Sequence, residues 1–353
     1  MSWKSRISSL ERVYSAVQFE ELDRVPIIPL LSYALSDLIG CSIYEYCHDA
    51  KRLSKAIVAG YRKFDYDAVI AFADVYLFAE AVGLKLDFPP DNVPTPKKSP
   101  IKNIESLDSL EIPDVEKDGR LPILLEAIER TSQELNDKVA IYSGGQGPFS
   151  LAAEIRGLES FLKDLYLNKT FARKLIRFTT EYMIEMGRAE VEAGAHIIHL
   201  GESFAGPSIV SPRFFKEFAL PYNRQIFDKW KSLGAVTSIH ICGDSSLIWP
   251  LIPETKTDIF EIDYMVDLEK AKEVFRNKTC LMGNIDPAGI IHRGSPKDNV
   301  QACKDCIKKG GNGGGYILGS GCLIMPGFPH KNLEVIVQTV KEFGKYKRKN
   351  VLI

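Results

Sequence analysis

His240 and Cys242 form a His-x-Cys pair at the end of one apolar run, and Cys322 follows a second apolar run much further along the chain. Imidazole nitrogens and thiolate sulfurs are ligands that zinc prefers, and a catalytic zinc site has three protein ligands and one open position. Two residues apart on a strand, His240 and Cys242 would point to the same face. From spacing alone, a catalytic zinc site and a buried histidine with two unrelated core cysteines are equally supported.

Short β-rich runs alternate with longer helical patterns along the chain, which is typical of parallel βαβ units. Eight such runs, each followed by a segment that can be helical, predict an α/β fold of the (β/α)8 TIM-barrel class, with residues 1–353 forming a single domain. The expected strands are Val25–Leu31, Ala68–Phe72, Val139–Ser143, His196–Gly201, Val236–Cys242, Ile259–Ile262, Thr279–Ile285 and Tyr316–Gly319.

The segment Lys85–Leu121 interrupts the alternation of strand and helix patterns after the second expected strand. It is rich in proline, aspartate and lysine and has too few apolar residues for a core of its own. The pattern predicts an irregular insertion that acts as a lid over the mouth of the barrel.

Polar residues follow several of the expected strands, at the barrel end where TIM-barrel enzymes carry their active sites. Glu202 and Asp263 are candidates for orienting a ligating imidazole, for general acid catalysis or for helix capping. Asp74 lies among apolar neighbours, which favours a raised pKa or a ligand contact. His196 and His199 would point to opposite faces of one strand, and core packing is the favoured interpretation of both.

The composition excludes several classes of partner. The formal net charge of -1 gives no reason to expect nucleic acid or an anionic membrane, and no apolar stretch approaches the roughly 20 residues needed to span a bilayer. The N-terminal residues lack the apolar core of a signal peptide, and the seven cysteines are an odd number. These features predict a cytoplasmic protein with reduced thiols, and Cys303 and Cys306 are interpreted as helix-packing residues.

Several motifs resemble those of the uroporphyrinogen decarboxylase superfamily, and within it the zinc-dependent corrinoid methyltransferases of the methylcobamide:coenzyme M type. The resemblance covers nearly the whole chain, and the segments that carry it are 64–67, 147–152, 211–222, 283–287 and 326–329. The decarboxylases have an arginine-rich segment after the first strand, where this chain reads Leu30-Leu31-Ser32-Tyr33-Ala34-Leu35-Ser36. The methyltransferase branch has His-x-Cys and a later cysteine, which match His240, Cys242 and Cys322.

The resemblance implies a zinc ion held by these three residues and a methyl group moved between a small molecule and the cobalt of a corrinoid, which a separate, transiently bound protein carries. Glu202, Asp263 and Asp74 are then the expected catalytic or substrate-contacting residues. Tyr33, Phe149, Asn284 and Met325 are the expected contacts of the cofactor at the mouth.

Two directions of transfer stay open at this stage. A thiol acceptor that bears a sulfonate, such as coenzyme M, would require a cation near the zinc, from Arg156 or Arg213. An aromatic methoxy compound would instead require an apolar, aromatic mouth. The segment Gly201–Gly206 departs from the Asp-rich loop expected of coenzyme M enzymes. A tetrapyrrole decarboxylase with Asp74 as its central acid, and a non-catalytic barrel with structural zinc, are the remaining alternatives.

Overall fold

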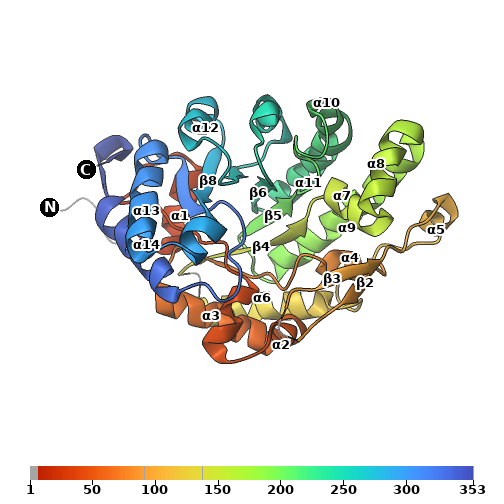
Figure 1. Cartoon of the computed structure of the whole chain (residues 1–353), viewed down its shortest axis with the longest axis horizontal. Coiled ribbons are helices and arrows are strands. Elements are labelled where there is room, and N and C mark those ends of the chain that lie inside the picture. Colours follow the sequence, from red (N-terminus) through yellow and green to blue (C-terminus); the bar gives the residue numbers. More distant parts are fainter. Residues whose placement is uncertain (1–6, 91, 137, 353) are drawn as a thin grey trace.

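Seven parallel strands form the central sheet of the computed structural model, which describes residues 7–90, 92–136 and 138–352. The strand order is β1-β4-β5-β6-β7-β8-β9, so every neighbour in the sheet is also the next main strand along the chain. Figure 1 shows the sheet curling inside a layer of helices. The strands are β1 (Ala68–Ile70), β4 (Ala140–Gln146), β5 (Ile197–Gly201), β6 (Val236–Ile241), β7 (Ile259–Ile262), β8 (Cys280–Ile285) and β9 (Tyr316–Ser320).

The first expected strand, Val25–Leu31, occupies the eighth place of the barrel but is not a regular strand. It makes one parallel bridge, from Ile27 to Leu318. Backbone hydrogen bonds join Ile28 N to Leu318 O at 2.8 Å on one side and Asp67 N to Ile27 O at 2.8 Å on the other. Pro26 and Pro29 lack the N–H groups that a continuous ladder requires. The segment therefore closes the barrel between β9 and β1 with few backbone hydrogen bonds.

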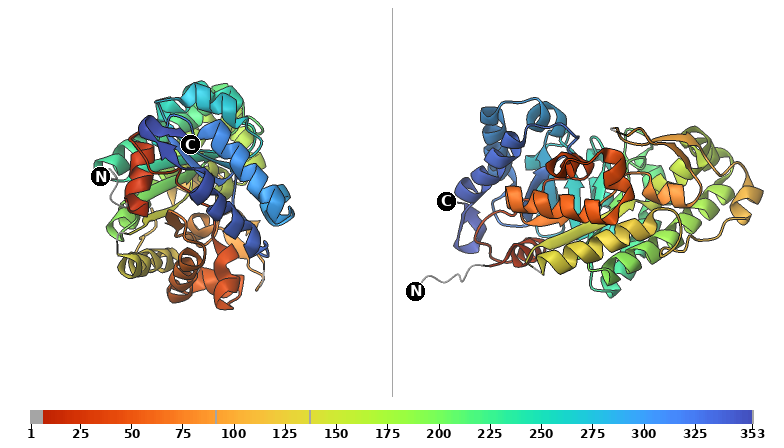
Figure 2. Two further views of the ribbon diagram at one scale, coloured as in Figure 1. Left: turned by 90° about the vertical axis from the view of Figure 1, so that its left-hand side faces the viewer. Right: turned by 90° about the horizontal axis from the view of Figure 1, so that it is seen from below.

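The helices after the strands cover the outside of the sheet, and α3 and α6 pack side by side there (Figure 2). The α-helices are α1 (Ser9–Val17), α2 (Ile43–His48), α3 (Ala50–Phe64), α4 (Leu77–Ala81), α5 (Ile104–Asp108), α6 (Leu121–Leu135), α7 (Pro148–Arg156), α8 (Leu158–Leu167), α9 (Lys169–Glu192), α10 (Pro212–Phe214), α11 (Leu220–Ser232), α12 (Leu268–Phe275), α13 (Pro296–Gly310) and α14 (His330–Phe343). Within the described ranges, no helix is long and apolar enough to cross a membrane. Residues 1–6, on which part of the prediction of a cytoplasmic protein depends, lie outside those ranges.

The insertion contains more regular structure than the sequence predicts. Strands β2 (Lys85–Asp87) and β3 (Thr95–Lys98) pair as an antiparallel hairpin, and α5 follows it. The insertion is fixed to the barrel because Arg156 donates hydrogen bonds to the carbonyl oxygens of Ile101 and Lys102. In Figure 1 the hairpin and α5 lie on the side of the barrel that carries α7 and α8. The role of this segment as a lid stays a prediction.

Asp67 joins the N-terminal part of the chain to β1 at the point of closure. Its side chain is fully buried and accepts hydrogen bonds from Arg12 Nη1 at 2.7 Å, from Arg24 Nη1 at 2.7 Å and from the backbone N of Ile27 at 2.8 Å. One carboxylate thus fixes α1, the closing segment and the start of β1.

A second buried carboxyl group, that of Glu190, should make the stability of the fold depend on pH. Burial raises the pKa of Glu190 on α9 to about 8, from an ordinary value of 4.5, although Ser143 Oγ donates a hydrogen bond to it at 3.0 Å. Between pH 4.5 and 8 the unfolded chain therefore loses this proton while the folded chain keeps it, so the free energy of unfolding falls as the pH rises. This loss should amount to roughly 3 to 5 kcal/mol and should disappear in Glu190→Gln.

The measurement is urea unfolding of the wild type and of Glu190→Gln at pH 5 and pH 8. The matched control is Glu185→Gln, which changes an exposed carboxylate on the same helix and should leave the pH dependence unchanged. Equal pH dependence in the wild type and in Glu190→Gln would contradict the assignment.

Candidate metal centre and pocket

The end of β6 places His240 at the mouth of the barrel. In the parallel register His240 lies between Gly201 of β5 and Glu261 of β7. Its neighbours Ile239 and Ile241 are fully buried, and His240 itself is 6% exposed. Cys242 follows the strand directly, and Gly243 then turns the chain with a φ of 78°. The strand therefore presents an imidazole and a thiol at one end of the barrel.

Cys322 reaches the same place from the last strand. Gly321 N donates a hydrogen bond to Ile285 O at 2.8 Å, and a β-carbon built at position 321 would lie 2.3 Å from Tyr264 N. Only glycine fits that approach of two backbones. The close contact after β9 allows Cys322 to cross the mouth toward β6.

These three side chains form a compact set of metal-ligand atoms. Those of His240, Cys242 and Cys322 all lie within 4.8 Å of one another, and His240 Nε2 is 3.3 Å from Cys242 Sγ. Tetrahedral zinc with bonds of about 2.3 Å to sulfur and about 2.0 Å to nitrogen needs a similar separation, of about 3.5 Å. His240 Nδ1 lies 3.2 Å from the backbone oxygen of Glu261, which leaves Nε2 free for a metal. The donor set therefore fits a zinc ion with one open position.

Cys242 and Cys322 lie close enough to affect each other's protonation. The pKa of Cys242 is lowered well below its ordinary value, first by a hydrogen bond from Cys322 to its sulfur and then by the imidazole of His240 beside it. The same hydrogen bond raises the pKa of Cys322. Burial alone would lower the pKa of His240, but the contacts with Cys242 raise it. A cation bound between the sulfurs would displace the thiol proton, as is usual for thiolate metal sites.

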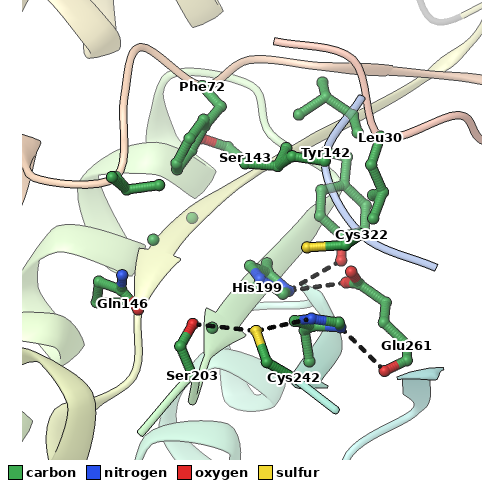
Figure 3. A pocket seen from close by; sticks show the side chains of 17 residues that line it. Leu30, Phe72, Tyr142, Ser143, Gln146, His199, Ser203, Cys242, Glu261 and Cys322 are labelled. Carbon is green, nitrogen blue, oxygen red and sulfur yellow. Dashed lines mark hydrogen bonds and ion pairs between the residues drawn. The ribbon is translucent and has the colours of Figure 1, made fainter. Parts of the chain in front are cut away.

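A pocket of about 170 Å³ opens beside these ligands, and Figure 3 shows its lining side chains. One wall is apolar and another is polar, and Ser203 Oγ lies 3.5 Å from Cys242 Sγ. The lining residues are Leu30, Ile70, Phe72, Val75, Tyr142, Ser143, Gly144, Gly145, Gln146, His199, Gly201, Ser203, His240, Cys242, Glu261, Cys322 and Leu323.

A network of polar side chains at this pocket was missed by the sequence analysis. Tyr142 donates to Ser238 Oγ at 2.8 Å, and Ser238 donates to Glu261 Oε1 at 2.7 Å. His199 Nδ1 lies 2.8 Å from the same carboxyl oxygen. Burial lowers the pKa of His199 to about 3, with a further contribution from His240, and burial raises the pKa of Glu261 well above its ordinary value.

The favoured interpretation of His199 as a core-packing residue needs correction, because it lines the pocket. The residues of this network come from four adjacent strands, β4, β5, β6 and β7. The signal in the sequence is a polar residue inside an otherwise apolar strand, as with His199 in Ile197–Gly201 and Glu261 in Ile259–Ile262. His196 directly precedes β5, three residues before His199, and its Nδ1 accepts a hydrogen bond from Ile141 N.

The three expected acids lie near the pocket without lining it. Glu202 is fully buried and accepts hydrogen bonds from Phe149 N and Ser150 N at the start of α7, and burial raises its pKa to about 7. Asp263 accepts from Gly243 N at 2.9 Å and so holds the turn after Cys242. Asp74 is paired with Arg120 at 2.6 Å.

The expected cofactor contacts are scattered. Tyr33 is buried near Asp74 and Cys322, Phe149 is fully buried against Phe161, and Met325 is 43% exposed. Asn284 donates hydrogen bonds to the carbonyl oxygens of Asp263 and Val266. None of these four described side chains lines the pocket, so their contact with a cofactor stays a prediction.

A curled parallel sheet with a His/Cys/Cys cluster at its mouth defines an α/β barrel whose mouth carries a set of metal-ligand residues. The chain belongs to the uroporphyrinogen decarboxylase (URO-D) family, whose model matches residues 8–343. The chain is 27% identical to the methylcobamide:CoM methyltransferase MtbA of Methanosarcina acetivorans, over 94% of this chain and 97% of that protein.

Two other relatives differ from each other in activity. The chain is 27% identical to the methylated-thiol--coenzyme M methyltransferase of Methanosarcina mazei, over 96% of this chain and 90% of that protein. It is 26% identical to a uroporphyrinogen decarboxylase of Trichlorobacter lovleyi, over 86% and 88%. Among solved structures, a methyltransferase from Methanosarcina mazei has the same fold, with a TM-score of 0.88, 24% identity and coverage of 96% of this chain and 99% of that one. The prediction of a barrel of this family is confirmed.

Proposed function

We propose that this protein is a zinc-dependent methyltransferase that moves a methyl group between the corrinoid of a partner protein and a small molecule, with a thiol acceptor as the first candidate. The observation that carries the proposal is the three-ligand set of His240, Cys242 and Cys322 beside a pocket. Relatives that act on methylcobamide and coenzyme M, by their names, support it. Three ligands fit a catalytic site better than a structural zinc site, which four ligands usually close.

Zinc bound here would supply Lewis acidity at the pocket, which helps a thiol to lose its proton or a methoxy oxygen to leave. Residues next to the ligands hold them in position. The backbone oxygen of Glu261 orients the imidazole of His240, and Asp263 holds the turn that follows Cys242. We assign Asp263 and Glu202 to positioning, Glu202 through its hydrogen bonds to the start of α7.

The decarboxylase alternative is less well supported by the site. Asp74, its expected central acid, is 1% exposed and is held by Arg120. A substrate with several carboxylates also requires cations, and no lysine or arginine is present among the described residues that line the pocket.

We also propose that the protein works in the cytoplasm and binds its corrinoid protein transiently at the mouth. All seven cysteines are free thiols, which suits a reducing compartment. The corrinoid must approach the ligand cluster from the mouth, because the methyl group passes directly between cobalt and the small molecule.

The test is methyl transfer by the purified protein, with the zinc content measured in the same preparation. One arm contains methylcobalamin and a panel of thiols, and the other contains cobalt(I) cobalamin and methoxylated compounds. Transfer in either arm that requires zinc supports the proposal and gives the direction. Porphyrinogen decarboxylation by zinc-free protein, with no transfer in either arm, would replace it.

A further inference from the structure

Within the part of the chain that the structure describes, no lysine or arginine is among the residues that line the pocket. An anionic group bound there would lose its hydration without gaining an ion pair, which is costly at a buried site. The pocket is therefore a poor site for a sulfonate or a carboxylate.

Two arginines near the barrel mouth do not change this conclusion. Arg156 is paired with Asp164 at 2.7 Å and donates to two carbonyl oxygens of the insertion. Arg120 is paired with both Asp74 and Glu80, so its charge is more than offset, although its Nη2 has no hydrogen-bond partner among the described residues. Arg156 therefore has its partners within the protein, and the two carboxylates around Arg120 offset the attraction of its charge for an anion.

An acidic group lies beside the polar wall of the pocket, where Glu154 accepts a hydrogen bond from Gln146 at 2.9 Å. Burial raises the pKa of Glu154 well above its ordinary value, and the negative charges of Asp74 and Glu202 raise it further. An anion bound beside Gln146 would lie close to the carboxyl group of Glu154. The electrostatic environment disfavours a negatively charged ligand.

The polar wall of the pocket offers hydrogen-bond acceptors instead. Gln146 is 9% exposed, and its Nε2 donates to Glu154 Oε1 at 2.9 Å, while its Oε1 has no hydrogen-bond partner among the described residues. A β-carbon built on Gly201 would lie 3.4 Å from both Gln146 Oε1 and His199 Nε2. His199 Nδ1 lies 2.8 Å from a carboxyl oxygen of Glu261, so Nε2 is the ring nitrogen left to face a ligand. A buried acceptor without a partner is stabilised when a ligand donates a hydrogen bond to it.

The remaining wall suits an apolar body of limited size. Leu30, Ile70, Phe72, Val75 and Leu323 line it. An engineered cavity of about 150 Å³ in another protein binds benzene, so the present volume of about 170 Å³ accommodates roughly one ring.

From these contacts we propose that the small-molecule substrate is an uncharged compound with an apolar body of at most one ring and one hydrogen-bond donor, and that sulfonate- or carboxylate-bearing thiols are poor substrates. Gln146 and the apolar wall are the specificity-determining elements. The inference rests on the proposed methyl transfer and names the substrate class of that site.

Two reactions are open to a substrate of this class. For a neutral thiol, the sulfur lone pair forms the S–C bond, the Co–C bond of methylcobalt(III) breaks with its electron pair left on cobalt(I), and the thiol proton goes to solvent. For a neutral methoxy compound, cobalt(I) supplies the electron pair of the new Co–C bond, the O–CH3 bond breaks, and the oxygen takes a proton to become a hydroxyl.

The test uses matched ligand pairs that differ in charge. The pairs are 2-mercaptoethanol with 2-mercaptoethanesulfonate, and 2-methoxyphenol with 2-methoxybenzenesulfonate. Binding to the zinc-loaded protein is measured by calorimetry, and methyl transfer is measured with cobalamin in the two arms given above. At least one neutral member should bind and react with a Kd and a KM at least tenfold below those of its anionic partner.

Two variants test the structural cause. Gln146→Met should weaken binding of 2-methoxyphenol by roughly three- to tenfold and should leave methoxybenzene, which lacks the donor, unchanged. The control Gln133→Met changes an exposed residue of α6. Val75→Lys should improve binding of the sulfonates at least tenfold, and thermal unfolding reports whether each variant is folded.

Equal or tighter binding of the anionic members would overturn the inference, as would the absence of binding by both members of both pairs. Binding of the neutral members without methyl transfer would support the ligand class and would refute the proposed function instead.

Discussion

Replacing Cys322 with alanine should remove most of the bound zinc, from about one ion per chain to a small fraction of that, because only one thiolate and one imidazole would then face the ion. Methyl transfer should fall by roughly three orders of magnitude, since the Lewis acid that activates the small molecule is lost. The zinc content is measured by elemental analysis after gel filtration, and transfer by the absorbance change of cobalamin.

The control is Cys306→Ala, which removes a half-buried thiol of α13 that is not part of the ligand cluster. It should keep both zinc and activity. His240→Ala should repeat the loss seen in Cys322→Ala. Full zinc content in Cys322→Ala would show that this sulfur is not a ligand.

Replacing Asp67 with alanine should lower the free energy of unfolding by about 3 to 5 kcal/mol, which is the usual cost of leaving a buried partner charge uncompensated. Arg12 and Arg24 have side chains that are 8% and 13% exposed, and both donate to this carboxylate. The backbone N of Ile27 would lose its acceptor as well. The effect is large because the closing segment has few backbone hydrogen bonds to compensate.

Urea unfolding followed by circular dichroism measures this change. The matched control is Asp228→Ala, which breaks an exposed ion pair with Lys256 and should cost less than about 1 kcal/mol. Similar losses in the two variants would mean that Asp67 does not hold the barrel closed.

The strands were predictable because their pattern is local. Each is a short apolar run bounded by polar residues, and seven of the eight expected runs are strands within a few residues. The exception, Val25–Leu31, contains two prolines, whose missing N–H groups prevent a regular ladder although the segment occupies its expected place. The hairpin in the insertion was not predicted, because its strands are exposed and carry no alternation of apolar residues.

By itself the sequence determined which residues could bind a metal. Ligand chemistry depends on residue type, and side chains two positions apart along a strand direction point to the same face, as His240 and Cys242 do. The tertiary structure decided which other polar residues share that site. It directs Glu202 to the start of α7 and Asp74 to Arg120, and it brings Gln146, His199 and Glu261 to the pocket from three different strands. These positions depend on strand register and on the closure of the barrel, which bring together residues that are far apart in the sequence.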